Sequence, residues 1–297
     1  MKTLFLLAGL PLLLSTLHAA AADSPLPAPA QVDAKRLTNA NLDPGNWMSH
    51  GRTYDEQRYS PLDAVNDKNV GQLGMAWTTR LDIDSGTEAT PIVVDGVMYT
   101  TGAFSIVYAM NAATGEMLWK YDPEVPPENL SQGCCGPVNR GVAVWNGKVY
   151  VGSFDGRLIA LDAATGKVAW SVDTIIDRSK SYSITGAPRI VKGKVLIGNG
   201  GAEFGVRGYV TAYDAQTGKE GWRRERPGNP NYASPILLRL GGKEQVIFTG
   251  CDVVTSLDPL TGPTEPPFSR EALVGFEILG GLTDQAVDVW RRRRRRR

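Results

Sequence analysis

The chain has 297 residues and a formal net charge of +1 at pH 7, but its basic residues are unevenly distributed. Setting aside Lys2 and the terminal block Arg291–Arg297 leaves 24 of the 32 basic residues against 31 acidic ones, and such an acidic chain disfavours nucleic acid as a partner. Only His50 remains once His18 is set aside with the N-terminal leader, which excludes a His-rich zinc site, a His-based triad and a Cys-x-x-Cys-His haem attachment.

Residues 1–22 are predicted to be a signal peptide. Lys2 supplies the positive start, Leu4 to Leu17 is mostly apolar, and Ala19 to Ala22 offers small residues for cleavage. The apolar run is shorter than the roughly 20 residues that a membrane-spanning helix needs, and no later segment is more apolar. We therefore expect an exported, periplasmic protein without a transmembrane segment, in a compartment where disulfides persist.

Residues 23–74 are expected to form an N-terminal arm and the segment that leads into the main domain. The first residues are rich in Pro and Ala, and the stretch from Asn46 to Leu62 is polar with interspersed aromatic residues. Such a stretch is more typical of a segment packed across one end of a domain than of a core strand. Residues 65–73 are expected to form a short helix that begins near Asn66 or Asp67. His50 is interpreted as a packing or hydrogen-bonding residue.

Residues 75–262 contain about four copies of one pattern. In each copy a short apolar run, a turn and a second apolar run lead to an Asp-x-x-Thr-Gly type segment, and three copies then end in Trp. The Trp positions are spaced by 51 and 52 residues. The repeated tryptophans are Trp119, Trp170 and Trp222, and Pro266 stands at the corresponding position of the fourth copy.

This pattern predicts an all-β fold, a β-propeller of four-stranded antiparallel blades that is apparently incomplete. Asp95-Gly96, Asn146-Gly147 and Lys192-Gly193 have the composition of two-residue hairpin turns. The later turn of each repeat carries a glycine that is free to take positive φ. Propeller repeats usually span about 40 to 50 residues. We expect the repeated Trp to pack between neighbouring blades. A β-sandwich is the alternative, but it does not predict such self-similarity.

Between the first two repeats lies Ser131-Gln-Gly-Cys-Cys-Gly-Pro-Val-Asn-Arg-Gly141, which is the most unusual stretch of the chain. A bridge between adjacent cysteines is strained, because their Cα atoms lie about 3.8 Å apart against the usual range of roughly 4.4 to 6.8 Å. Two reduced, buried thiols are therefore the default interpretation of Cys134 and Cys135. Cys251 is interpreted as a buried structural thiol.

Residues 263–297 are expected to be an irregular tail. They begin with a proline-rich stretch, continue without a clear pattern and end in polyarginine, a like-charge block that is usually disordered. We interpret this tail as the result of truncation, misassembly or a frameshift.

The repeats and the Cys-Cys stretch together resemble the quinoprotein alcohol dehydrogenases of the methanol and ethanol dehydrogenase type, over the N-terminal half of such enzymes only. The likeness runs from Asn46 to Trp222. It includes Gln57-Arg-Tyr-Ser-Pro-Leu62, the Cys-Cys pair with Arg140, Ile184-Thr-Gly-Ala-Pro188 and the glycine-rich stretch from Gly198 to Gly208. Trp-ending repeats alone are weakly specific, whereas their combination with Cys-Cys and Gly-Gly-Ala-Glu is specific.

The resemblance implies roles for individual residues around pyrroloquinoline quinone (PQQ) and a metal, calcium or a lanthanide. Cys134 and Cys135 are implied to form a vicinal disulfide that covers one face of the quinone, and Glu203 is implied to ligate the metal. The other implied cofactor-binding residues are Glu88, Arg140, Thr185, Gly201 and Ala202.

These roles are chemically reasonable and each has a plainer alternative. The three carboxylates of PQQ suit the planar donor fork of an arginine, and a hard cation such as calcium prefers oxygen ligands. A metal-bound quinone accepts hydride from the alcohol carbon while a carboxylate removes the hydroxyl proton. The alternatives are a surface ion pair for Arg140, a turn residue in Glu88 and a solvated loop acid in Glu203.

The resemblance predicts a periplasmic oxidation of a primary alcohol to an aldehyde, with a c-type cytochrome on a separate chain as electron acceptor. The family's catalytic Asp and a metal-ligating Asn come from blades beyond those recognised here, so no residue is assigned as the base. We therefore expect a truncated or chimeric copy with little activity alone. The alternative is a non-enzymatic propeller that acts as a protein-interaction scaffold, of the outer-membrane assembly type.

Overall fold

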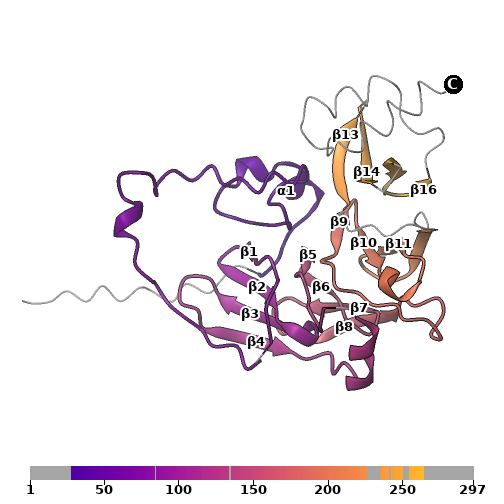
Figure 1. The fold of residues 1–297 in the computed structure, drawn as a ribbon. Helices are drawn as coiled ribbons and strands as arrows, with labels where there is room; N and C mark the ends of the chain where they lie inside the picture. The colour runs from indigo at the N-terminus through magenta and orange to yellow at the C-terminus, as the bar shows by residue number, and fades with distance from the viewer. Residues whose placement is uncertain are drawn as a thin grey trace, which may run out of the picture.

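The computed structural model of this chain describes residues 28–83, 85–133, 135–225, 235–240, 242–249 and 254–263. The predicted signal peptide, most of the predicted tail, Cys134 and Cys251 lie outside these residues. Strands dominate the described part of the chain, and they are arranged as four separate sheets that follow one another round an arc (Figure 1). The prediction of an all-β, partial propeller of four-stranded blades is confirmed.

Each sheet consists of four antiparallel strands in sequence order. The strands of the first two sheets are β1 Ile92–Val94, β2 Val97–Thr101, β3 Val107–Asn111, β4 Met117–Tyr121, β5 Ala143–Trp145, β6 Lys148–Gly152, β7 Arg157–Asp162 and β8 Val168–Asp173. Those of the last two are β9 Arg189–Val191, β10 Lys194–Asn199, β11 Tyr209–Asp214, β12 Glu220–Glu225, β13 Ile236–Leu240, β14 Lys243–Thr249, β15 Val254–Asp258 and β16 Gly262–Pro263.

Helical elements are short and lie outside the sheets. They are α1 Ala34–Thr38 and the 3-10 turns η1 Ala40–Leu42, η2 Val70–Gln72, η3 Ala103–Ser105, η4 Pro127–Gln132 and η5 Ala202–Phe204. None of the helices in the described part of the chain is both long and apolar enough to span a membrane.

The first hairpin of each of the first three sheets has the turn chemistry that the sequence predicts. Asp95 and Gly96 both have positive φ, 50° and 82°, and Asn146 has φ 43°. Two consecutive residues with positive φ match the right-handed twist of the flanking strands, and Asn, Asp and Gly adopt this conformation at the lowest cost. The next turn packs on the hairpin, as in the hydrogen bond from the Ala163 amide to the Gly147 carbonyl at 2.9 Å.

A tryptophan from the outer strand of one sheet docks onto the glycine turn of the next sheet. A side chain at Gly166 would begin 2.7 Å from the ring of Trp119, so only glycine leaves room for the indole. The Trp119 Nε1 atom donates to the Ala163 carbonyl at 2.9 Å. Trp170 and Trp222 repeat the arrangement on the following sheets. The repeated Trp therefore packs between blades, as predicted.

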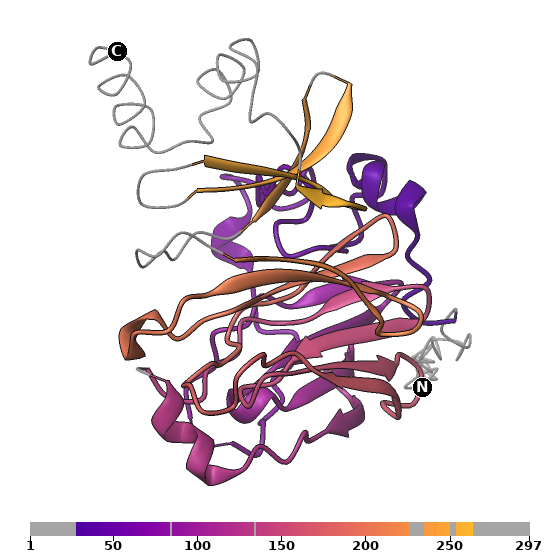
Figure 2. The ribbon, with the colours of Figure 1, turned by 90° about the vertical axis from the view of Figure 1, so that its right-hand side faces the viewer.

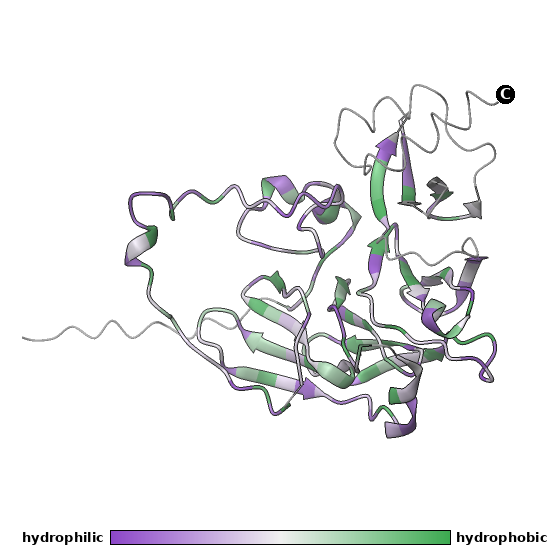
Figure 3. Cartoon of the chain, in the orientation of Figure 1, coloured by the Kyte–Doolittle hydropathy of each residue, from purple (hydrophilic) through white to green (hydrophobic). Residues whose placement is uncertain are grey.

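The core lies within and between the sheets. Figure 3 shows apolar residues concentrated along the strands, and the middle strands β3, β6 and β7 are almost wholly buried. The outer strands β4 and β8 alternate between exposed and half-buried residues. This difference is expected when the inner strands of neighbouring sheets pack face to face and each outer strand borders solvent.

The N-terminal arm packs on the end of the sheets where the hairpin turns lie. Trp47 pairs with Val93 of β1, and the Asn146 amide donates to the Val32 carbonyl at 2.9 Å. The predicted helix over 65–73 is wrong: only the single turn η2, Val70–Gln72, forms there. A helix this short gains little without an apolar face to bury, and this stretch is exposed almost throughout.

Candidate cofactor site

The residues implied to bind the cofactor lie at the opposite end of the sheets from the hairpin turns. The segments that lead into β1, β5 and β9 run side by side at this end. The Thr90 amide donates to the Arg140 carbonyl at 3.3 Å, and the Arg140 amide donates to the Thr185 carbonyl at 3.0 Å. This backbone pairing places residues from three repeats, far apart in sequence, at one mouth of the arc.

The Arg140 side chain joins two other predicted residues. Its Nη2 atom lies 3.0 Å from Glu88 Oε2, and its Nη1 atom donates to Thr185 Oγ1 at 2.8 Å. The side chains of Arg140 and Glu88 are 45% and 44% exposed, so the guanidinium also faces solvent. The structure thus brings Glu88, Arg140 and Thr185 together. Arg140 forms an ion pair in this structure, as the alternative interpretation of this residue predicts.

The glycine-rich stretch after β10 is connected to the Thr185 segment. Ser183 and Gly200 form an antiparallel bridge with hydrogen bonds of 3.2 and 2.9 Å. Gly201 has φ 139°, and a side chain there would clash with the Ser181 carbonyl, so the close approach of the two backbones requires glycine. Ala202 follows at the start of η5, and Glu203 is exposed. These residues lie at the same end of the third sheet as Thr185.

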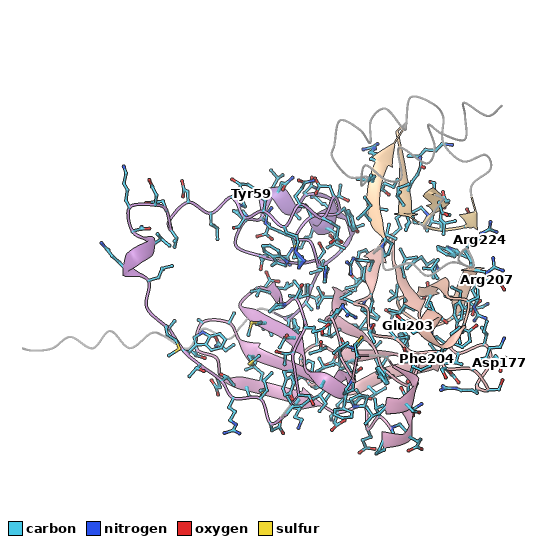
Figure 4. All side chains as sticks on the ribbon, in the orientation of Figure 1. Tyr59, Asp177, Glu203, Phe204, Arg207 and Arg224 are labelled. Atoms are coloured by element: carbon cyan, nitrogen blue, oxygen red, sulfur yellow. The ribbon has the colours of Figure 1, made fainter. Side chains whose placement is uncertain are left out.

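Glu203 and Phe204 lie on the third sheet's side of the molecule, well away from Tyr59 of the N-terminal arm (Figure 4). Within the described residues, His, Cys, Asp and Glu side chains do not gather in a group of three or more that fits a metal ion. Any further ligands of a metal at Glu203 must therefore be backbone or amide oxygens, residues outside the described ranges or another chain. The metal-ligand role of Glu203 stays a prediction.

The Cys-Cys stretch precedes β5, and the loop that follows it is held by the buried side-chain amide of Asn139. The sequence alone does not indicate this role. Cys135 is exposed and Cys134 lies outside the described residues, so the pairing of the two stays a prediction. Asn139 is 1% exposed. Its Oδ1 atom accepts from Thr101 Oγ1 at 2.9 Å and from the Gly141 amide at 3.0 Å, and its Nδ2 atom donates to Ser105 Oγ and to the Gly152 carbonyl.

Replacement of Asn139 by alanine is expected to lower the free energy of unfolding by about 2–4 kcal/mol, because buried partners lose their hydrogen bonds. Urea unfolding followed by tryptophan fluorescence measures this change. Asn39→Ala is a suitable control, since Asn39 is exposed and its side chain donates only locally, to the Lys35 carbonyl. Equal losses in the two variants would contradict a special role for Asn139 in holding the loop before Arg140.

A second arginine approaches the site from the N-terminal segment. The Arg58 Nη2 atom donates to Thr90 Oγ1 at 2.7 Å, next to the backbone bond between Thr90 and Arg140. Arg58 and Glu56 both have positive φ, and a side chain at Gly51 would clash with the Glu56 backbone. The sequence signal was present in the Gln57-Arg-Tyr-Ser-Pro segment, but only the fold shows what Arg58 reaches.

A buried group of charged and polar side chains lies behind Arg58. Glu56 Oε1 and Arg189 Nε are 2.8 Å apart, with 17% and 13% of their side chains exposed. Burial raises the pKa of Glu56 and lowers that of Arg189, in each case against the attraction of the partner. His50 lines the same small cavity, and its Nδ1 atom is buried without a hydrogen-bond partner. Burial, with Arg189 and Arg58 nearby, lowers the pKa of His50 from 6.5 to about 4.

Stability is therefore expected to fall as the pH falls from about 6.5 towards 4. In this pH window His50 is protonated in the unfolded chain and neutral in the folded chain, so protonation favours unfolding. The raised pKa of the neighbouring Glu56 acts in the opposite direction. The difference between the unfolding free energies of the wild-type chain and His50→Gln isolates the histidine. This difference should change between pH 7 and pH 5, and a pH-independent difference would show that His50 does not carry the effect.

Comparison with known proteins places these features in a family. A family profile described as "PQQ: Glucose/ethanol/alcohol dehydrogenase, beta-propeller domain" matches residues 47–239. The chain is 66% identical over 203 residues to the quinohemoprotein alcohol dehydrogenase ADH-IIG of Pseudomonas putida, which covers 68% of this chain and 28% of that protein. It is 54% identical over 187 residues to the 1-butanol dehydrogenase (cytochrome c) of Thauera butanivorans, covering 63% of this chain and 27% of that protein.

Comparison with solved structures supports the same family. The crystal structure of the quinohemoprotein alcohol dehydrogenase from Comamonas testosteroni matches with a TM-score of 0.71 and 40% identity, over 79% of this chain and 42% of that one. The chain therefore belongs to the family of PQQ-dependent quinoprotein alcohol dehydrogenases, as its resemblance predicted. It spans about 28% of the length of the Pseudomonas putida relative.

Proposed function

We propose that this chain forms part of a PQQ site and serves in the periplasmic oxidation of a primary alcohol to an aldehyde. The observation that carries the proposal is the contact of Glu88, Arg140 and Thr185 at one mouth of the sheets. Their bond distances are 3.0 and 2.8 Å, and the guanidinium is partly open to solvent. A structural ion pair at this position would not need the additional glycine-rich stretch beside it.

The residues fit the polar edge of PQQ. Arg140 presents a planar fork of donors that suits a carboxylate, and Thr185 Oγ1 beside it offers a second polar atom. Glu88 lies on the other side of the guanidinium, where its carboxylate forms an ion pair with the fork and orients it. The backbone of Gly201 and Ala202 is proposed to contact the cofactor, because these residues lie at the same end of the third sheet as Thr185.

The cysteines and Glu203 are proposed to complete the part of the site that this chain supplies. Cys134 and Cys135 are proposed to form a disulfide bridge that covers one face of the quinone. Glu203 is proposed to bind the metal, calcium or a lanthanide, through its carboxylate. The predicted signal peptide supports a periplasmic location, where such a bridge is stable.

PQQ and its metal, if held by these residues, would supply an electrophilic quinone carbonyl as the hydride acceptor for the alcohol. The role proposed for this chain is to bind and orient the cofactor. Arg140 holds and neutralises negative charge, and Glu88 and Thr185 fix the guanidinium. No described residue is assigned as the base that removes the hydroxyl proton. A c-type cytochrome is the proposed electron acceptor, in line with the name of the Thauera butanivorans relative.

The proposal is tested by incubating the purified chain with PQQ and calcium chloride, removing free cofactor by gel filtration and recording the quinone absorbance. Retained absorbance that falls in the Cys134→Ala variant is the expected result. Dye-linked alcohol oxidation by the same sample is measured in parallel as the readout of catalysis. No retained cofactor at all, with the fold intact by circular dichroism, would instead favour a non-enzymatic scaffold.

A further inference from the structure

The turn formed by residues 51–58 has an uncommon backbone conformation. Arg52, Glu56 and Arg58 have positive φ values of 71°, 56° and 54°. Residues with a Cβ atom adopt this region rarely, and they persist there only where surrounding contacts fix them. A side chain at Gly51 would begin 2.4 Å from the Cα atom of Glu56, and the Arg58 amide donates to the Gly51 carbonyl at 3.0 Å. The turn is therefore folded tightly on itself.

The N-terminal arm carries this turn to the end of the sheets where Arg140 lies. Trp47 pairs with Val93 of β1 in an antiparallel bridge, so the chain after Trp47 runs towards Thr90 and the segment before β1. The arm, drawn in indigo, lies against the sheets in both views (Figure 1 and Figure 2). The course of the arm thus explains how residues so early in the chain reach the candidate site.

Two side-chain contacts connect the turn to the segments on either side of Arg140. In the segment before β1, Thr90 Oγ1 accepts from Arg58 Nη2 at 2.7 Å. At the start of β9, Arg189 Nε donates to Glu56 Oε1 at 2.8 Å, and this ion pair is largely buried. The turn therefore spans the two segments between which Arg140 lies.

The Arg140 segment is packed closely between these two neighbours. The Thr90 amide donates to the Arg140 carbonyl, and the Arg140 amide donates to the Thr185 carbonyl. Gly141 has φ 121°, and a side chain there would begin 3.0 Å from the Thr90 carbonyl oxygen and 3.9 Å from the Ala187 Cβ atom. Because there is so little room, a shift of either neighbour moves the backbone that carries the Arg140 guanidinium.

We propose that this turn is a clamp that sets the position of the Arg140 guanidinium, with Arg58 as a positioning residue that acts through Thr90. Glu56 and Arg58 extend from the same tight turn to the two flanking segments, so the turn fixes the spacing between those segments. A fixed spacing limits the positions that the Arg140 donors can take before a ligand arrives. Donors ordered in advance bind more tightly than donors that must be ordered on binding. The inference rests on the proposed function for the identity of the ligand, PQQ.

Amide hydrogen exchange of the full chain tests the clamp without a cofactor. In Arg58→Ala the Thr90 and Arg140 amides are expected to exchange about 10-fold faster than in the wild type, because the segment before β1 loses its contact with the turn. The Ala163 amide, in a turn of the second sheet, should keep its rate. Arg58→Lys retains a donor for Thr90 and should restore most of the protection. Unchanged exchange at Thr90 and Arg140, or an equal increase at Ala163, would overturn the clamp.

A double-mutant cycle on PQQ affinity tests whether Arg58 acts through Thr90. Arg58→Ala and Thr90→Val are each expected to raise the Kd for PQQ about 3–10-fold, and the double variant no further than the larger single effect, because both changes remove one contact. Equilibrium dialysis at fixed calcium and fixed salt gives the four constants. Arg80→Ala, which removes an exposed arginine outside the turn, controls for the loss of positive charge.

The outcomes of this cycle separate the clamp from the proposed cofactor site. Additive effects of the two changes, or an unchanged Kd in Arg58→Ala when the wild-type chain binds PQQ, would contradict the positioning role. An equal effect of Arg80→Ala would reduce the role of Arg58 to its charge. A wild-type chain that retains no PQQ would refute the proposed cofactor site, and the hydrogen exchange of Thr90 and Arg140 would still decide whether the turn holds the Arg140 segment.

Discussion

Truncation of Trp170 to alanine is expected to lower the free energy of unfolding by about 3–5 kcal/mol, the usual range for the loss of a large packed aromatic residue. Trp170 joins the second sheet to the third. A side chain at Gly218 would begin 2.9 Å from its ring, and its Nε1 atom donates to the Ala215 carbonyl at 3.2 Å. The ring also packs at 5.8 Å from Tyr150, centroid to centroid. Its removal opens a gap that the rigid turn around Gly218 cannot fill.

The conservative variant Trp170→Phe separates packing from hydrogen bonding. It keeps an aromatic ring against Gly218 but loses the donor, so a smaller loss of about 1–2 kcal/mol is expected. Urea unfolding at pH 7, followed by far-ultraviolet circular dichroism, gives both values. If Trp170→Phe proved as destabilising as Trp170→Ala, the hydrogen bond to Ala215 would dominate, and the packing account of the blade junctions would be wrong.

The blades were predictable from sequence because their determinants are local and repeated. Asn146-Gly147 specifies a hairpin within two residues, and a strand that alternates or runs continuously apolar is recognised from a handful of positions. The spacing of Trp119 and Trp170 then shows that the same unit recurs. The docking of each Trp on the next turn follows once the sheets are stacked.

The N-terminal arm was less predictable because nothing local decides its conformation. The helix expected over 65–73 is reduced to the turn Val70–Gln72, and the large apolar residues on both sides of it are exposed. Short helices are marginal in water without tertiary packing, whatever their capping residues suggest.

The candidate site was predictable in part. Glu88, Arg140 and Thr185 were named through resemblance, and the structure brings them together. The contributions of Asn139 and Arg58 were missed, since each depends on contacts between segments far apart in the chain. Asn139 reaches Thr101, 38 positions before it in the sequence, and Arg58 reaches Thr90. In a single sequence, an asparagine next to an arginine does not indicate which distant residues its side chain will contact.

Replacement of Arg140 by alanine is expected to weaken PQQ binding by about 10–100-fold, corresponding to the loss of charge-assisted hydrogen bonds worth roughly 1.5–3 kcal/mol. This expectation rests on the proposed PQQ site. Arg140→Lys keeps the charge but not the planar fork, so its affinity should lie between those of the wild type and the alanine variant. Equilibrium dialysis of the full chain with PQQ, at fixed calcium and fixed salt, measures the three dissociation constants.

Arg178→Ala is the matched control for this measurement. Arg178 lies 2.6 Å from Asp173, with 50% and 51% of the two side chains exposed, close to the exposure of Arg140 and Glu88. Both exposed pairs should contribute at most about 1 kcal/mol to stability, so neither variant should unfold the chain. A weakening of PQQ binding confined to the Arg140 variants identifies a ligand-directed arginine. Unchanged affinity in Arg140→Ala would mean that the contact with Glu88 and Thr185 serves the fold alone.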